Sequence, residues 1–161
     1  KGFSFNKVLE AIKILNKNNI IIIGNLIIGV NLDATEEAIR KEIQFMKTID
    51  VDIISYVLLT PFPGSDTLKE LDEKGLVFTK EWSKYTVFDP VIKTNRLSPQ
   101  QLYELLYYSF RELKYITDYK KIAKKVYKTR GLKFCLNPFR IITLINSYLK
   151  VLGLFKEIKE K

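Results

Sequence analysis

The spacing of apolar positions near the start of the chain predicts an amphipathic helix followed by a buried strand. After Ser4, which can cap a helix, apolar residues recur every three or four positions until the polar run at residues 16–19. Residues 20–28 are then almost continuously apolar and show no polar alternation. Such a run is typical of a strand that is buried on both faces of a parallel sheet.

The same order of elements follows a second time. Asp33 and Glu36 have the spacing of a capping box and predict a helix over about residues 34–49, with one apolar face. Residues 51–59 are rich in β-branched and aromatic side chains and predict a second strand. Helix, strand, helix, strand in this order favours an α/β fold in which a crossover helix joins two parallel strands.

The rest of the chain is expected to be mostly helical. Ser98, Pro99 and Gln101 form a strong helix start, with a serine cap, proline at the first helical position and glutamine at the third. We therefore divide the chain into an α/β unit, residues 1–97, and a helical extension, residues 98–161. The α/β unit is expected to end with a rigid turn, a short helix and an ordered surface loop, over residues 60–65, 66–74 and 76–97.

Charge is distributed unevenly along the 161 residues. The chain carries a net charge of +9, and residues 118–161 hold twelve Lys or Arg against three acidic residues. A basic helical module that binds nucleic acid or an anionic membrane is therefore the alternative function, and of these two partners we do not expect nucleic acid. The tail also has helically spaced apolar residues, which fit either an interfacial helix or a helix packed on the protein: Phe139, Ile142, Ile145, Leu149 and Leu152.

Several kinds of chemistry are excluded by composition. With no histidine and one cysteine, Cys135, the chain has no Ser-His-Asp or Cys-His pair, and by itself it cannot supply a zinc site of histidines or an iron-sulfur site of thiolates. Neither glycine-rich phosphate loop motif occurs. The lone thiol favours a reducing, cytoplasmic location. The start at Lys1, without an initiator methionine or a signal segment, indicates a piece of a longer protein.

The carboxyl ends of the two expected strands are the candidate site, because ligands of α/β sheets bind outside that edge. Gly29 allows close approach of a ligand to the backbone, and Asn31 and Asp33 can form hydrogen bonds there. The same three residues also suit a strand exit and a helix cap, so both interpretations stay open. Tyr56 is expected to be a core aromatic, with stacking on a bound purine as the alternative.

Several segments together resemble the second half of a radical S-adenosylmethionine (SAM) catalytic domain, over about residues 1–117. In detail the chain looks most like the subgroup that often carries a cobalamin-binding domain and includes anaerobic magnesium-protoporphyrin ester cyclase and related methyltransferases. The most specific segment is Thr-Pro-Phe-Pro-Gly-Ser at residues 60–65. The others are Leu-Ile-Ile-Gly at 26–29, Asp-Ala-Thr-Glu-Glu-Ala-Ile at 33–39, Trp-Ser-Lys-Tyr at 82–85 and Leu-Ser-Pro at 97–99.

This resemblance implies that the chain is the C-terminal part of a partial (βα)6 barrel. In such enzymes a 4Fe-4S cluster sits on a Cys-x-x-x-Cys-x-x-Cys loop, and SAM is cleaved to a 5′-deoxyadenosyl radical. That loop is absent here, so it is expected upstream of Lys1, in an N-terminal half that would be this chain's partner. Alone, the chain should be inactive. The implied reaction is hydrogen abstraction, cyclisation or cobalamin-assisted methyl transfer on a small organic substrate.

The resemblance also implies roles for particular residues. The family's Ile-x-Gly stretch, which contacts adenine, falls on residues 27–29, and its Ile-x-x-Tyr element falls on residues 53–56. The expected SAM contacts are Ile27, Gly29, Asn31 and Tyr56. The expected substrate contacts are Thr60, Pro61 and Phe62.

Overall fold

A computed structural model describes residues 4–113 and 119–135, and the apolar tail positions between 139 and 152 lie outside the described residues. The described elements, in chain order, are α1 (Phe5–Lys17), β1 (Ile23–Ile28), α2 (Glu36–Met46), β2 (Ile53–Leu58), α3 (Asp66–Glu73), the 3₁₀ helix η1 (Trp82–Lys84), α4 (Pro99–Leu113), α5 (Tyr119–Arg130) and α6 (Leu132–Cys135).

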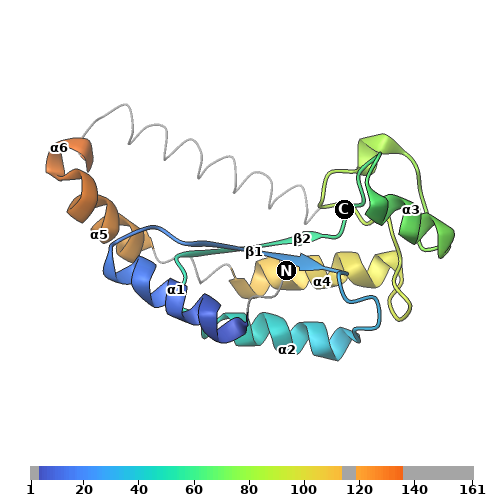
Figure 1. Ribbon diagram of the computed structural model, residues 1–161, viewed down its shortest axis with the longest axis horizontal. Helices are drawn as coiled ribbons and strands as arrows, with labels where there is room; N and C mark the ends of the chain where they lie inside the picture. Colours follow the sequence, from blue (N-terminus) through green and yellow to red (C-terminus); the bar gives the residue numbers. More distant parts are fainter. Residues whose placement is uncertain (1–3, 114–118, 136–161) are drawn as a thin grey trace.

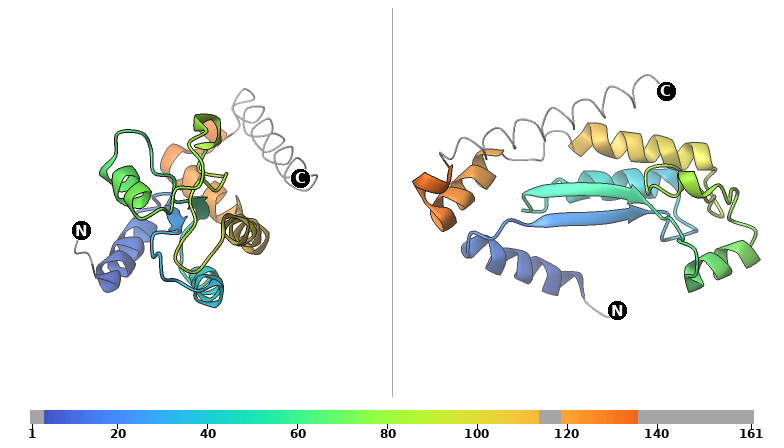
Figure 2. Two further views of the ribbon diagram at one scale, coloured as in Figure 1. Left: turned by 90° about the vertical axis from the view of Figure 1, so that its right-hand side faces the viewer. Right: turned by 90° about the horizontal axis from the view of Figure 1, so that it is seen from above.

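Strands β1 and β2 form a parallel pair, with Ile23 opposite Ile53 and Ile28 opposite Leu58. This confirms the predicted α/β class and the crossover through α2. Helices α2 and α4 lie along the sheet, α5 lies near the end where the strands begin, and α3 lies near the end where they finish (Figures 1 and 2). The two ends of the sheet are therefore covered by different helices.

One face of the sheet forms the main core. Tyr56 and Leu58 of β2 and Ile28 of β1 are buried with two isoleucines of α2 and three leucines of α4. Those helical residues are Ile39, Ile43, Leu102, Leu105 and Leu106. Helix α4 is also tied to α2, because Gln44 donates a hydrogen bond to the Glu112 carboxylate at 2.9 Å. The first helix of the expected extension thus packs on the same core as the sheet.

The other face of the sheet is open among the described residues. Ile23 is 58% exposed and Ile27 is 48% exposed, so the prediction of a strand buried on both faces over residues 20–28 is wrong for this part of the chain. The observed pattern alternates between more and less exposed residues. The reason is that α2 and α4 cover one face, and a fully buried strand needs a layer on each side.

The N-terminal caps of α4 and α2 are formed by nearby side chains, and one of the two caps differs from the prediction. The Ser98 hydroxyl accepts a hydrogen bond from the Gln101 amide at 3.3 Å, and the Gln101 side chain accepts one from the Ser98 amide at 3.0 Å, which confirms the predicted reciprocal cap. The cap of α2 is Thr35, whose hydroxyl accepts from the Ala38 amide at 3.2 Å. The prediction of Asp33 as that cap is wrong, because its carboxylate instead accepts a hydrogen bond from the Asn95 side chain at 2.9 Å.

The segment between α3 and α4 is more than a surface loop. Its buried hydrophobic residues belong to the main core, and they are Leu76, Tyr85, Val91, Ile92 and Leu97. An antiparallel bridge joins Val77 to Ile92. The carbonyl of Val87 accepts a hydrogen bond from the Leu58 amide at 2.8 Å, so this segment covers part of the outer edge of β2. None of the helices within residues 4–113 and 119–135 is long and apolar enough to cross a bilayer.

Candidate functional site

The two strands finish side by side, as the sequence predicted. The Leu59 amide donates a hydrogen bond to the Ile28 carbonyl at 2.8 Å, which extends the parallel pairing one residue past the strands. Gly29 then turns the chain with φ +97°, a backbone conformation that glycine adopts at little cost. A Cβ at Gly29 would lie 3.5 Å from the Leu59 side chain. The turn therefore requires glycine for its backbone, whatever it binds.

The loop after Gly29 is held by its own polar groups. The Asn31 side-chain oxygen accepts a hydrogen bond from the Asp33 amide at 3.1 Å, and the Asn31 carbonyl accepts one from the Ala34 amide at 3.2 Å. The Leu32 carbonyl accepts from the Asn95 amide at 3.0 Å, which ties this loop to the segment before α4. These contacts are those expected if Asn31 and Asp33 serve the exit from the strand. They also hold the loop in a fixed position beside the strand end.

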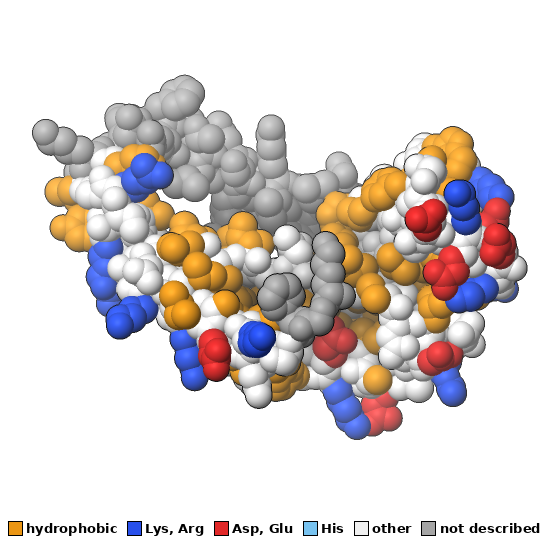
Figure 3. All heavy atoms as spheres, in the orientation of Figure 1, with side chains coloured by type: hydrophobic (Ala, Val, Ile, Leu, Met, Phe, Trp, Pro, Cys, Tyr) orange, Lys and Arg blue, Asp and Glu red, His pale blue; other side chains and the backbone are white. Residues whose placement is uncertain are grey.

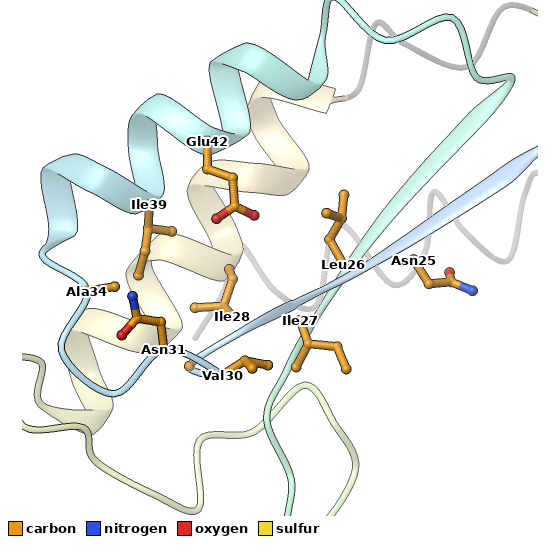
Figure 4. Close-up of a pocket in the computed structure, with 10 residues that line it drawn as sticks. Asn25, Leu26, Ile27, Ile28, Val30, Asn31, Ala34, Ile39 and Glu42 are labelled. Atoms are coloured by element: carbon orange, nitrogen blue, oxygen red, sulfur yellow. The ribbon is translucent and has the colours of Figure 1, made fainter. Parts of the chain in front are cut away.

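A pocket of about 360 Å³ lies along β1 and this loop (Figure 4). It brings together three of the predicted site residues, Ile27, Gly29 and Asn31. In the close-up the Glu42 carboxylate extends from α2 toward the strand. The full lining is Asn25, Leu26, Ile27, Ile28, Gly29, Val30, Asn31, Ala34, Ile39 and Glu42.

The pocket follows a free edge of the sheet. The bonds from the Ile53 amide to Ile22 and from the Leu59 amide to Ile28 show that the even-numbered residues of β1 pair with β2. Because alternate residues of a parallel strand bond to opposite sides, the peptide groups of Ile23, Asn25 and Ile27 point away from β2. No other strand of the described residues pairs with that edge. The pocket therefore contains backbone donors and acceptors as well as side chains.

Tyr56 lies apart from this pocket. Its side chain is 1% exposed and packs in the main core, whereas Ile27 lies on the open face of the sheet. Tyr56 is therefore a core aromatic residue, as the sequence analysis expected. The hydroxyl is buried without a hydrogen-bond partner among the described residues. Burial raises the pKa of Tyr56 well above its usual value, and the negative charge of Glu42 raises it further, so the hydroxyl stays protonated.

The three predicted substrate residues follow β2 directly. The Thr60 hydroxyl donates a hydrogen bond to the Leu58 carbonyl at 3.2 Å, and both Thr60 and Pro61 are buried. Phe62 is 51% exposed. At this strand end Phe62 is therefore the member of the three whose side chain is available to a ligand.

Glu42 is a site residue that the sequence analysis did not single out. It lies three residues after the buried Ile39 on α2, so the helical period turns it toward the sheet. This spacing could have identified Glu42 from the sequence. Loss of water around the carboxyl raises the pKa of Glu42 above its usual value of 4.5, although the residue as a whole is exposed. The charged form is thus disfavoured in the folded protein.

Replacing Glu42 by glutamine is expected to raise the melting temperature slightly near neutral pH. Because the folded state holds the Glu42 proton more tightly, stability falls as the pH rises from about 4.5 through the raised pKa, and Glu42→Gln removes that loss. The gain should disappear below about pH 4, where the carboxyl is protonated in both states. Thermal melts at both pH values measure it. Glu37→Gln, at an exposed site on the same helix, is the control, and an equal gain there would contradict the assignment.

The residues at the strand ends suit part of a SAM site but not a cluster site. The exposed Ile27 side chain offers an apolar surface of the kind that an adenine ring packs on, whereas Gly29 is buried and a Cβ there would face Leu59 and the buried Ile92. The single cysteine of the chain cannot supply the three thiolates of a 4Fe-4S loop. Among the described residues no group of His, Cys, Asp and Glu could hold a metal ion.

The described residues form an α/β unit with a two-strand parallel sheet and a candidate site at the strand ends. No protein-family model matches it. It is 32% identical over 106 residues to an uncharacterized methyltransferase of Pyrococcus horikoshii, a match that covers 66% of this chain and 23% of that protein. It is 29% identical over 144 residues to bacteriochlorophyllide d C-8(2)-methyltransferase of Chlorobaculum tepidum, covering 89% of this chain and 28% of that protein.

A third relative has a different activity in its name. The chain is 26% identical over 102 residues to anaerobic magnesium-protoporphyrin IX monomethyl ester cyclase of Rubrivivax gelatinosus, covering 63% of this chain and 18% of that protein. The chain therefore spans about a quarter of the length of these curated relatives. Methyltransferases and a cyclase at low identity support the resemblance to radical SAM enzymes at the level of a family.

Proposed function

We propose that this chain forms the last two strands of a radical SAM barrel and supplies walls for SAM and for a small organic substrate. The observation that carries the proposal is the pair of adjoining strand ends, where Gly29 turns with φ +97° beside the exposed Ile27. The sheet is open on one face and along one edge, which suits a barrel whose other strands belong to the rest of the protein. That N-terminal half is the proposed partner.

The two strand ends have different proposed roles. Ile27 forms the surface for the adenine ring, Gly29 turns the chain beside it, and Asn31 holds the loop that borders it through its contact to the Asp33 amide. Phe62 faces the substrate, while Thr60 and Pro61 are buried and fix the start of the turn that presents it. Bound SAM would supply the radical chemistry, with electrons from a 4Fe-4S cluster whose cysteines lie outside this chain.

The proposed reaction is methyl transfer or cyclisation on the organic substrate. The support is the names of the three relatives described above, of which two are methyltransferases and one is a cyclase. Cobalamin is a proposed additional cofactor, bound by a domain elsewhere in the protein. Tyr56 would then act from the core, by packing behind β1 and β2, and not by touching SAM directly.

Replacing Ile27 by aspartate is expected to weaken SAM binding by at least tenfold, or about 1.4 kcal/mol. Ile27 is already half exposed, so the sheet should tolerate the change, but a carboxylate would have to lose water for adenine to pack against it. Calorimetric titration of SAM into the intact, cluster-loaded protein measures the affinity. Ile14→Asp, at an isoleucine on α1 that is 62% exposed, is the matched control.

The two variants together decide the assignment. Equal SAM affinity for wild type, Ile14→Asp and a folded Ile27→Asp would show that adenine does not lie on this strand end. A loss of affinity in Ile27→Asp alone would support it. Circular dichroism of both variants establishes that each is folded.

A further inference from the structure

A second pocket lies at the opposite end of the sheet, where the strands begin. It has a volume of about 190 Å³ and lies between the end of α1, the loop before β2 and helix α5. Its lining is Asn16, Asn19, Asp50, Lys121, Lys124, Lys125 and Lys128. Four lysines thus line one small pocket. Basic side chains are also visible along this end of the molecule in the space-filling view (Figure 3).

Two of the four lysines are already neutralised. Lys125 is 5% exposed, and its ammonium lies 2.5 Å from the Asp52 carboxylate and 2.6 Å from the Asn16 side-chain oxygen. The Lys121 ammonium lies 2.5 Å from the Asp50 carboxylate and 3.4 Å from that of Asp52. Two cations therefore face two carboxylates, and these contacts fix α5 against the start of the sheet.

The other two lysines leave a surplus of positive charge. Lys124 and Lys128 lie one turn apart on α5, and no carboxylate of the described residues is within 4.0 Å of either ammonium. Residues 119–130 contain no acidic side chain that could balance them. The Asn19 side chain lines the same pocket and adds an amide donor. The pocket thus offers two uncommitted cations and a neutral donor on a scaffold held by a buried ion pair.

We propose that this pocket binds a phosphate group, carried either by a small phosphorylated molecule or by a lipid headgroup. A phosphate is a compact anion with several acceptor oxygens, and paired ammonium groups beside an amide N–H match that chemistry. A metal cation would meet four lysines, and the two carboxylates are already engaged. The site is separate from the strand-end pocket, so it stands whether or not the proposed SAM site is correct.

The test uses the intact protein with pyrophosphate as the probe. Reversing both free charges, in Lys124→Glu with Lys128→Glu, should weaken pyrophosphate binding at least tenfold, and added salt should weaken binding to the wild type. Both side chains are exposed, so the variant should fold. The matched control is Lys7→Glu with Lys93→Glu, which reverses two exposed lysines that do not line the pocket. Calorimetry gives the affinities, and circular dichroism checks folding.

A second arm identifies the source of the phosphate. Co-sedimentation with phosphatidylglycerol vesicles, compared with phosphatidylcholine vesicles, tests the lipid headgroup. Binding of pyrophosphate, or of anionic vesicles alone, that is lost in the pocket variant and kept in the control supports the site and names its source. Binding of neither probe, or equal binding by wild type and both variants, overturns it. Binding of a DNA duplex without either of these probes also overturns it.

Discussion

Replacing Asp52 by asparagine is expected to lower the free energy of unfolding by about 3 to 5 kcal/mol. The Asp52 side chain is completely buried, and its carboxylate accepts hydrogen bonds from the Lys125 ammonium at 2.5 Å and from the Ile22 amide at 2.8 Å. The amide of asparagine is neutral, so the change would leave the 5% exposed Lys125 charge without its compensating carboxylate. Urea unfolding of the intact protein measures the loss.

Two controls separate the buried charge from a general effect of the substitution. Glu37→Gln breaks the exposed Glu37–Lys41 pair and should change stability by less than about 0.5 kcal/mol. Adding Lys125→Met to Asp52→Asn should recover much of the loss, because the double variant buries no unpaired charge. An Asp52→Asn protein as stable as wild type would show that the ion pair does not hold α5 in place.

The same pair predicts an acid-dependent loss of stability. Burial alone would raise the pKa of Asp52, but the hydrogen bonds from Lys125 and Ile22 and the charge of Lys121 outweigh it, and the pKa is lowered below its usual value of 3.8. The unfolded state therefore binds the proton more readily, so this contribution is present above about pH 4 and is lost as the pH falls through the lowered pKa. In Asp52→Asn, the free energy of unfolding should not show the decrease at low pH that protonation of Asp52 causes in the wild type.

Replacing Gly29 by valine is expected to be the most damaging single change at the candidate site. At φ +97° a β-branched side chain is strained, which costs about 1 to 3 kcal/mol. The added Cβ would face Leu59 at 3.5 Å and the buried Ile92 at 3.9 Å, so a larger side chain should displace the turn that borders the proposed adenine surface. We therefore expect both lower stability and at least tenfold weaker SAM binding, measured by thermal melts and by calorimetry on the intact protein.

Gly75→Val separates backbone strain from ligand contact. Gly75 has φ +63° and open space around its Cβ position, and it follows α3 and does not line the strand-end pocket. It should lose stability and keep its SAM affinity. Gly29→Asn supplies a folded variant if valine prevents folding, because asparagine tolerates a left-handed backbone better. Unchanged SAM affinity in Gly29→Asn would contradict the site.

Local chemistry made several features predictable from the sequence. The reciprocal cap of Ser98 and Gln101 depends on residues three positions apart, and the end of α3 depends on Gly75, so both could be recognised in short windows. The cap of α2 was misplaced because Asp33 and Thr35 are equally good caps by type. The choice between them depends on Asn95, which is 62 residues from Asp33.

Other features depend on contacts that no short window contains. Lys125 and Asp52 are 73 residues apart, and each alone looks like ordinary surface charge. The open face of β1 was missed because a run of isoleucines is typical of a buried strand, whereas no layer among the described residues covers that face. Tyr56 fitted the family pattern and a core role equally well, and the direction of its side chain was decided by the register with β1.

The unpaired edge of β1 makes the chain prone to aggregation. Residues 20–28 contain no charge, no proline and several β-branched side chains, and the exposed edge lacks the lysines or bulges that commonly prevent strand-to-strand aggregation. Copies that meet before this edge is covered can pair through it. If the rest of the proposed barrel shields this strand, the chain should be more soluble when it is produced together with that part.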